Sequence, residues 1–143
     1  MTSLSRSLLA ATAVVALAAG SASAAEIRVV VAHYSDATQE IFRGMAADFM
    51  EANPDVTVIV ENVSWDNLQQ LLTTDIAGGT APDVAIIGTR WLVDYVANDI
   101  AEPLDGCVTD EVRGRFIETF LDPSVIDGVT YGLPVAASAR ARY

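Results

Sequence analysis

The sequence predicts an α/β fold with a mainly parallel sheet and helices on both faces of that sheet. Three short apolar runs, residues 27–32, 56–60 and 83–87, each precede a stretch whose apolar residues recur at helical spacing. Strands that alternate with helices in this way form parallel sheets joined by right-handed crossovers. The runs are apolar throughout rather than alternating, which indicates strands that are buried on both faces.

Residues 1–24 have the three parts of a secretory signal peptide. Arg6 and the amino terminus make a short positive region, and residues 8–19 are an uncharged apolar run that is followed by small residues ending at Ala24. The alternative, a membrane anchor, needs about 20 apolar residues, and this run is shorter. We therefore predict cleavage after Ala24 and a mature segment, residues 25–143, that does not insert into a membrane.

The segment after the first strand predicts a helix that ends before Pro54. Asp36 and Gln39 have the spacing of a capping box, and Asn53-Pro54 stops the helix. Its apolar residues are Ile41, Phe42, Met45, Ala46 and Phe49.

Two more helices are predicted after the second and third strands. Asp66 is placed to cap the helix after the second strand, and Gly78-Gly79 is placed to end it. The helix after the third strand is expected to span residues 89–97. Their apolar residues are Leu68, Leu71, Leu72, Ile76, Leu92, Tyr95 and Val96.

The rest of the chain predicts shorter elements. Residues 100–104 read as a short extended piece, and residues 109–121 carry apolar side chains on one face of a fourth helix. Asp127-Gly128 is a strong turn signal between residues 125–126 and 129–131, which predicts a hairpin.

The charge and the rare residues exclude several classes of function. The net charge is -11, and all 8 basic residues are arginine. Such an acidic chain repels phosphate backbones and anionic lipids, so we expect no nucleic-acid partner. One histidine is too few for a zinc cage, and the single Cys107 cannot form an internal disulfide and lies far from the cleavage site, so it is no lipid attachment point.

A ligand site is expected at the carboxyl ends of the strands, where open parallel sheets bind their ligands. Three loops meet there, residues 33–36, 62–67 and 88–91, and each combines an aromatic ring with hydrogen-bonding groups. Both tryptophans of the chain, Trp65 and Trp91, are in these loops. Aromatic faces beside carboxylate, amide and guanidinium groups suit a neutral polar ligand such as a sugar.

Simpler roles explain the same residues. Asp36, Ser64 and Asp66 can be ordinary helix caps, and a tryptophan after a strand is often a half-buried packing residue. Arg90 has acidic neighbours with which it can pair on the surface.

Catalytic signatures are missing from the sequence. It contains no G-x-S-x-G, H-E-x-x-H, Walker or G-x-G-x-x-G motif, so we expect neither an enzyme nor a cofactor. The alternative is a small secreted α/β hydrolase that uses paired carboxylates, because 19 acidic residues leave such a pair open.

The order of several motifs resembles a known family. IRVVVAHYSDATQEIFRGMAADFMEANPDVTVIVENV is followed by GGTAPDVAIIG, IAEPLD and DGVTYGLPVAASARARY. With the signal peptide, this order resembles the extracellular solute-binding proteins of bacterial ABC importers, family 1, the carbohydrate binders that include maltose-binding protein. G-x-x-P-D-V at residues 79–84 and D-G-x-x-Y-G-L-P at residues 127–134 carry most of the resemblance.

The resemblance implies a periplasmic, monomeric protein of two α/β lobes that close on a sugar and deliver it to the permease subunits of the importer. It implies no chemistry and no metal. The cleft residues that it implies are Tyr34, Ser35, Asp36, Trp65, Asn67, Thr89, Arg90, Trp91, Ser138 and Arg140.

Two features depart from the family pattern. Residues 135–137 are apolar where relatives often have polar cleft residues, and Arg142 stands where an apolar strand residue is usual. Family members are also much longer, so residues 25–143 are expected to be the N-terminal lobe up to the hinge, without the second lobe. A binding module of another system, such as a sensor of extracellular solutes, is a further alternative.

Overall fold

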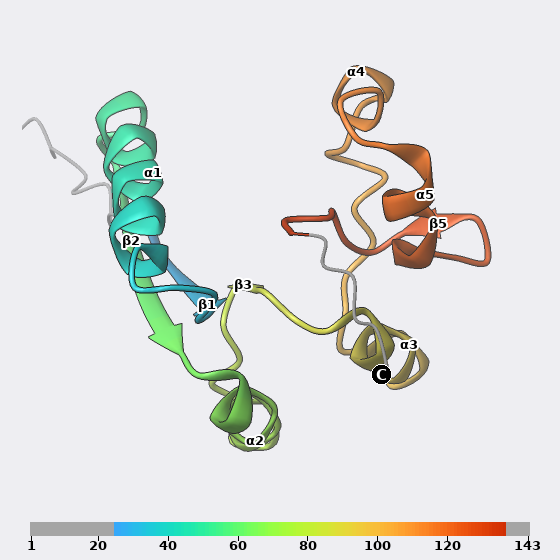
Figure 1. Ribbon diagram of the computed structural model, residues 1–143, viewed down its shortest axis with the longest axis horizontal. Coiled ribbons are helices and arrows are strands. Elements are labelled where there is room, and N and C mark those ends of the chain that lie inside the picture. The colour runs from blue at the N-terminus through green and yellow to red at the C-terminus, as the bar shows by residue number, and fades with distance from the viewer. Residues whose placement is uncertain (1–24, 137–143) are drawn as a thin grey trace, which may run out of the picture.

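A computed structural model describes residues 25–136, and these form an α/β structure around a small parallel sheet (Figure 1). Its strands are β1 (Ala25–Ala32), β2 (Val56–Val63) and β3 (Val84–Ala85). β1 lies in the centre, pairs in parallel with β2 along its whole length, and pairs in parallel with β3 on its other side. The predicted parallel sheet is confirmed, although β3 is shorter than the expected run of residues 83–87.

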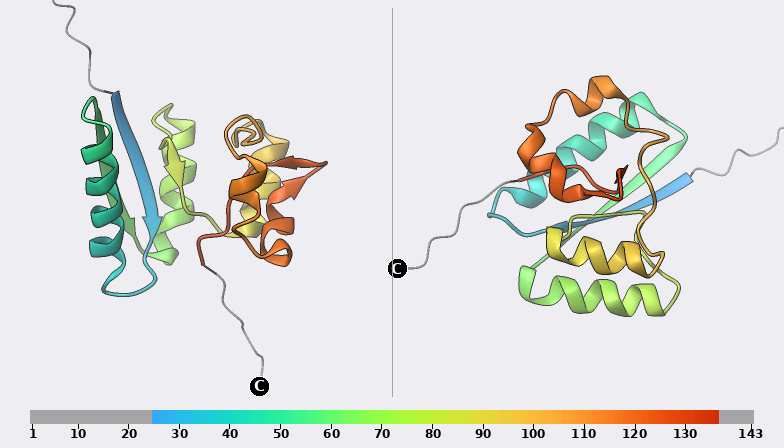
Figure 2. Two further views of the ribbon diagram at one scale, coloured as in Figure 1. Left: turned by 90° about the horizontal axis from the view of Figure 1, so that it is seen from above. Right: turned by 90° about the vertical axis from the view of Figure 1, so that its right-hand side faces the viewer.

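The first helices cover both faces of this sheet. α1 (Thr38–Ala52) lies on one side and α2 (Trp65–Ala77) on the other, and α3 (Thr89–Ala97) lies beside α2 (Figure 2). The core between the layers contains fully or nearly fully buried side chains of β1, α2 and the end of the third strand segment: Val30, Val31, Ala32, Leu68, Leu72 and Ile86. Helices on both faces explain why the residues of β1 are apolar at successive positions.

The caps predicted at Asp36 and Asp66 are wrong, whereas Ser64, also expected as a cap, does occupy the N-cap position of α2. Ala37 is the N-cap of α1 and Ser64 is the N-cap of α2, and neither makes a side-chain capping bond. Asp36 lies one residue before the N-cap position of α1, and Asp66 lies inside the first turn of α2. The ends are as expected, because α1 stops at Asn53 and α2 stops before Gly79, whose φ of 71° suits glycine.

The fourth helix predicted over residues 109–121 is two short helices, α4 (Asp110–Arg113) and α5 (Glu118–Leu121). The Thr109 side chain caps α4 by accepting a bond from Val112 N. The helix breaks after Gly114 because Ile117 is extended, at φ −73° and ψ 121°, and then caps α5. The apolar pattern continued across this break, so periodicity alone did not reveal it.

A turn of 3-10 helix (Asp122–Ser124) leads into the predicted hairpin, which is confirmed as β4 (Val125–Ile126) and β5 (Val129–Thr130). Asp127 and Gly128 both have positive φ, 50° and 83°, as a two-residue hairpin turn requires. Residues 100–104 form no strand, but Leu104 N donates to Thr130 O at 2.7 Å and ties this segment to the hairpin.

Arg28 links the sheet to α2. Its guanidinium donates to Glu61 of β2, to Asp75 of α2 at 2.7 Å and to Thr80 O at 2.9 Å. The hydrogen bonds with Glu61 and then Asp75 raise the pKa of Arg28 above its already high value. Arg28 therefore stays charged and holds β1, β2 and α2 together.

None of the helices within residues 25–136 is long and apolar enough to cross a membrane. The predicted signal peptide lies outside the described residues, as do Ser138, Arg140 and Arg142.

Candidate functional site

The three predicted loops meet at one edge of the sheet. β1, β2 and β3 are parallel, so their carboxyl ends lie at the same edge, and α1, α2 and α3 begin beyond it. The register places Ala32 opposite Val63, so the loops that follow β1 and β2 start level with each other. The start of a helix carries partial positive charge, so this edge favours the oxygen atoms of a ligand.

Three aromatic rings from the three loops form a row. Tyr34 and Trp65 lie edge to face with ring centroids 5.6 Å apart, and Trp65 and Trp91 do the same at 6.1 Å. Tyr34 follows β1, Trp65 begins α2, and Trp91 lies in the first turn of α3. The structure therefore brings together the three aromatic residues that the sequence singled out.

The rings differ in how much surface they offer. Tyr34 is 45% exposed and Trp65 is 38% exposed, whereas Trp91 is half-buried and packs against the core of the sheet. Partial burial raises the pKa of the Tyr34 hydroxyl, so it stays protonated and can donate a hydrogen bond. Trp91 combines the packing role of a core residue with a place in the aromatic row.

The loop that carries Tyr34 is held by Thr38, a residue that the sequence reasoning missed. Thr38 is 3% exposed, and its Oγ1 accepts bonds from Tyr34 N at 3.0 Å and Ser35 N at 2.9 Å. Thr38 N in turn donates to Ser35 O at 3.0 Å. A threonine three residues after Ser35, at the start of a helix, was the available signal for this turn.

The loop that carries Trp91 is shaped by Gly88. Trp91 N donates to Gly88 O at 2.8 Å, and the indole ring packs over the glycine. A Cβ at this position would lie 3.6 Å from the ring, in ordinary contact. The loop therefore does not require glycine at this position, because an alanine side chain would fit beneath the ring.

A polar pair connects the ends of β1 and β2. His33 N donates to Val63 O at 2.8 Å, and the Asn62 side-chain nitrogen lies 3.3 Å from His33 Nδ1. Asn62 Oδ1 is buried and has no hydrogen-bond partner among the described residues. This acceptor lies beside the loop of Tyr34.

The other predicted polar residues within the described part of the chain belong to the same three loops as the rings. Ser35, Asp36, Asn67, Thr89 and Arg90 are all exposed. The suggested ion pair of Arg90 does not form with any of the described residues. Ser138 and Arg140 lie outside the described residues. Among residues 25–136, no group of three or more acidic, histidine or cysteine residues is arranged to hold a metal ion.

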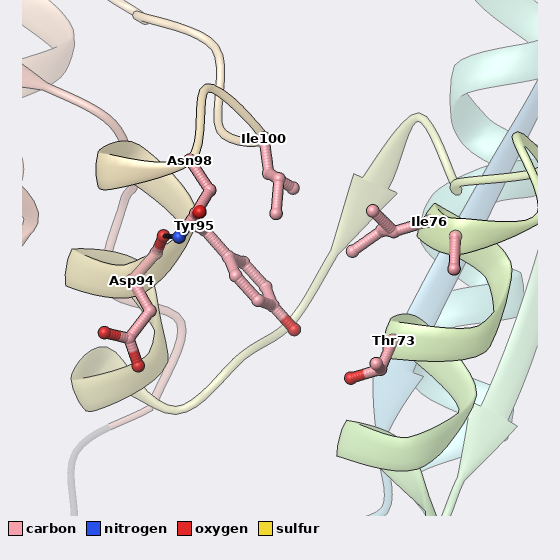
Figure 3. Close-up of a pocket in the computed structure, with 7 residues that line it drawn as sticks. Thr73, Ile76, Asp94, Tyr95, Asn98 and Ile100 are labelled. Atoms are coloured by element: carbon pink, nitrogen blue, oxygen red, sulfur yellow. Dashed lines mark hydrogen bonds between the residues drawn. The ribbon is translucent and has the colours of Figure 1, made fainter.

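A groove of about 290 Å³ lies away from the row, between α2 and α3 (Figure 3). Tyr95 extends from α3 towards Ile76 of α2, and Ile100 closes one end. The Tyr95 hydroxyl is buried without a hydrogen-bond partner in this part of the chain. Most of the exposed lining surface is apolar, and Thr73, Asp94 and Asn98 also line the groove.

Comparison with known proteins agrees with the geometry. The family model for bacterial extracellular solute-binding proteins matches residues 35–142. A binding protein of Brucella abortus is 57% identical over 136 residues, which cover 95% of this chain and 33% of the relative. The maltotriose-binding protein of Pyrococcus abyssi is 27% identical over 80% of this chain and 25% of its own length.

The structure of the sugar-binding protein MalE from Xanthomonas citri matches 76% of this chain and 28% of its own, with a TM-score of 0.68 and 27% identity. The predicted periplasmic-binding-protein-like α/β fold is confirmed by this similarity. The chain spans about a third of the length of the Brucella relative. The match over residues 35–142 shows that the chain belongs to the family of bacterial extracellular solute-binding proteins.

Proposed function

We propose that this chain binds a carbohydrate outside the cytoplasm and that the row of Tyr34, Trp65 and Trp91 is its contact surface. The row is the observation that carries the proposal, because it presents two exposed rings and a half-buried one at the ligand-binding edge of the sheet. Membership of a solute-binding family and the sugar and maltotriose specificity of two relatives support it.

The chemistry of the row fits a sugar better than a charged ligand. A pyranose ring has apolar faces that pack on aromatic rings and hydroxyls that both donate and accept hydrogen bonds. Asp36, Asn67 and Arg90 are exposed residues of the same three loops, and they offer an acceptor, a mixed group and a donor. We assign ligand contacts to these three residues and to Ser35, Thr89, Ser138 and Arg140.

We infer further that the protein acts in uptake through an ABC importer and passes its solute to permease subunits without altering it. The signal peptide of residues 1–24, with cleavage after Ala24, would place it in the periplasm. Residues 25–143 would supply the N-terminal lobe and therefore one wall of the cleft, ending at the hinge.

Intrinsic fluorescence tests the proposal directly, since both tryptophans of the chain belong to the row. Titration with maltotriose and a panel of other saccharides should change the emission of the secreted chain. Because residues 25–143 would supply only one wall of the cleft, we expect weak binding, with half-saturation at a saccharide concentration on the order of 1 mM.

Trp65→Ala should abolish the heat of saccharide binding measured by calorimetry, a readout that does not depend on the removed fluorophore, and Phe120→Ala should preserve it. Phe120 is a suitable control because it is 48% exposed and lies on α5, away from the row. If no saccharide changes the emission, and calorimetry of a longer form also gives no heat, the assignment to carbohydrate is wrong.

A further inference from the structure

The groove between α2 and α3 is lined by a tyrosine whose hydroxyl has no partner. The hydroxyl oxygen of Tyr95 is buried, and none of the residues that the structure describes forms a hydrogen bond with it. A buried hydroxyl that stays unpaired destabilises the folded protein. Because buried polar side chains nearly always have a partner, this hydroxyl marks a place that needs a hydrogen-bonding group.

The position of Tyr95 is fixed by the turn that ends α3. Its carbonyl oxygen accepts hydrogen bonds from Ile100 N at 2.8 Å and from Ala101 N at 3.3 Å. The turn passes through Asp99, whose φ is 54°. These bonds hold Ile100 at the end of the groove, where its side chain forms part of the lining. The α3 side of the groove is therefore bounded by a hydrogen-bonded turn.

The wall formed by α2 is fixed as well. Ile76 packs against the core of the sheet, and the Thr73 hydroxyl donates to Gln69 O at 2.8 Å. That bond uses the single proton of the Thr73 hydroxyl, so Thr73 Oγ1 can only accept a further bond.

The two hydroxyls of the groove complement each other. Figure 3 shows the Tyr95 hydroxyl directed towards α2 and the Thr73 hydroxyl directed towards α3. Burial raises the pKa of Tyr95, so its hydroxyl stays protonated and can donate a hydrogen bond. The walls thus offer one donor and one acceptor to the space between the helices.

We propose that this groove is a second ligand site and that it binds a small uncharged molecule with an apolar body and one hydroxyl group, such as a phenol. A hydroxyl accepts from Tyr95 and donates to Thr73, so it matches both walls. Ile76, Ala77 and Ile100 supply apolar contacts. The volume of about 290 Å³ lies at the lower limit of ligand pockets, so it suits a single ring.

The charge of the lining disfavours ionic ligands. Asp94 is the charged residue of the lining, and it repels a carboxylate or a phosphate. Figure 3 shows the Asp94 carboxylate directed away from α2, so it does not face the two hydroxyls. An ammonium group would therefore lose its hydration beside the apolar walls without gaining an ion pair. An uncharged ligand avoids both costs.

The groove is separate from the aromatic row. Its residues lie near the carboxyl ends of α2 and α3, whereas Trp65 and Trp91 lie in the first turns of these helices. From Trp65 to Thr73 the distance along α2 is about 12 Å at the helical rise per residue. The proposal therefore does not depend on carbohydrate binding at the row.

Ligand-observed fluorine NMR with para-fluorophenol tests the proposal on the secreted chain. The probe signal should broaden saturably, with half-saturation on the order of 1 mM. Tyr95→Phe removes the hydroxyl and keeps the ring, so it should weaken binding by about 2- to 10-fold. Ala77→Phe should fill the groove and abolish binding. Tyr131→Phe and Ala47→Phe, at positions outside the lining, are the matched controls and should bind as the wild type does.

Urea unfolding without the probe gives a second, independent readout. Tyr95→Phe should unfold at the same urea concentration as the wild type or at a higher one, because it removes an unpaired buried group. A lower midpoint would overturn the proposal, since the hydroxyl would then be bonded within the protein. Far-UV circular dichroism verifies that Ala77→Phe is folded.

Three results of the binding experiment would also contradict the proposal. The first is a wild type without saturable broadening, and the second is unchanged affinity in Tyr95→Phe or in folded Ala77→Phe. The third is loss of binding in Trp65→Ala, because the probe would then stack on the aromatic row.

Discussion

Trp65 and Trp91 lie edge to face, with ring centroids 6.1 Å apart and ring planes at 63°, yet only one of them belongs to the core. Trp65 stands on the surface at the start of α2. Trp91 packs its ring on Gly88 and on the buried side chains of the sheet. One aromatic contact thus connects the interior of the protein to its candidate binding surface.

The two tryptophans should respond differently to truncation. Trp65→Ala should lower the free energy of unfolding by less than about 1 kcal/mol, since an exposed ring contributes little to the core. Trp91→Ala should lower it by about 2 kcal/mol or more, because it leaves a cavity beside the core. Urea unfolding followed by far-UV circular dichroism measures both, and equal losses would contradict the difference in burial.

Thr38→Val should loosen the loop of Tyr34. The substitution keeps the shape of the side chain but removes the oxygen that accepts from Tyr34 N and Ser35 N. The two stranded donors should cost about 1–3 kcal/mol of stability. Hydrogen exchange of these two amides should accelerate as well.

Thr38→Ser is the matched control, because it keeps the acceptor. It should retain slow exchange at Tyr34 and Ser35 and lose less stability than the valine variant. If valine and serine variants exchange equally fast, the hydroxyl does not hold the loop.

Asp105 should make stability depend on pH at the acid end. The Thr130 amide, and then the Arg113 charge, hold the pKa of Asp105 below its usual value. Its contribution is therefore complete above the usual aspartate pKa of about 4 and is lost as the pH falls through the lowered value.

Asp105→Asn should thus destabilise the protein at pH 7, and its difference from the wild type should shrink below about pH 4. Urea midpoints measured between pH 3 and pH 7 give the comparison. Glu102→Gln, an exposed acid on the same segment, controls for the loss of one negative charge. A difference that stays constant over this range would show that the carboxylate does not stabilise the fold.

Two glycines provide opposite predictions for the same substitution. Gly88→Ala should stabilise the protein by about 0.5 kcal/mol, because its φ of −72° suits alanine and the new Cβ makes only ordinary contact with Trp91. Gly128→Ala should destabilise it by about 1 kcal/mol, because its φ is 83°. Thermal unfolding of both variants checks the sign, and a stable Gly128→Ala would mean that the hairpin turn tolerates a side chain.

The parallel sheet and the aromatic row could be predicted because they depend on local signals and one general rule. The apolar runs identified the strands, and the rule that parallel strands end at one edge brought Tyr34, Trp65 and Trp91 together. The limits of α3 were predicted correctly for a similar reason, since Gly88 ends the strand segment and the apolar spacing runs to Ala97.

The misses have physical causes of their own. The break between α4 and α5 begins at Gly114, the C-cap of α4, a signal that the sequence reasoning did not use, and it ends at the extended backbone of Ile117. The bonds of Thr38 and the four-way contact of Arg28 arise from tertiary placement, and side-chain type alone does not specify such partners. Acidic residues near the helix starts also suggested side-chain caps. The N-cap positions are instead occupied by Ala37 and Ser64, and neither makes a side-chain capping bond.

The central place of β1 has a consequence for the order in which the chain can fold. β1 is synthesised before both of its partners, Val56–Val63 and Val84–Ala85. Val29, Val30 and Val31 therefore have no strand to pair with until α1 and then β2 have left the ribosome, and β3 follows only after α2. Assembly of this sheet must begin with contacts between segments that are distant in the sequence, so we expect folding to be slow.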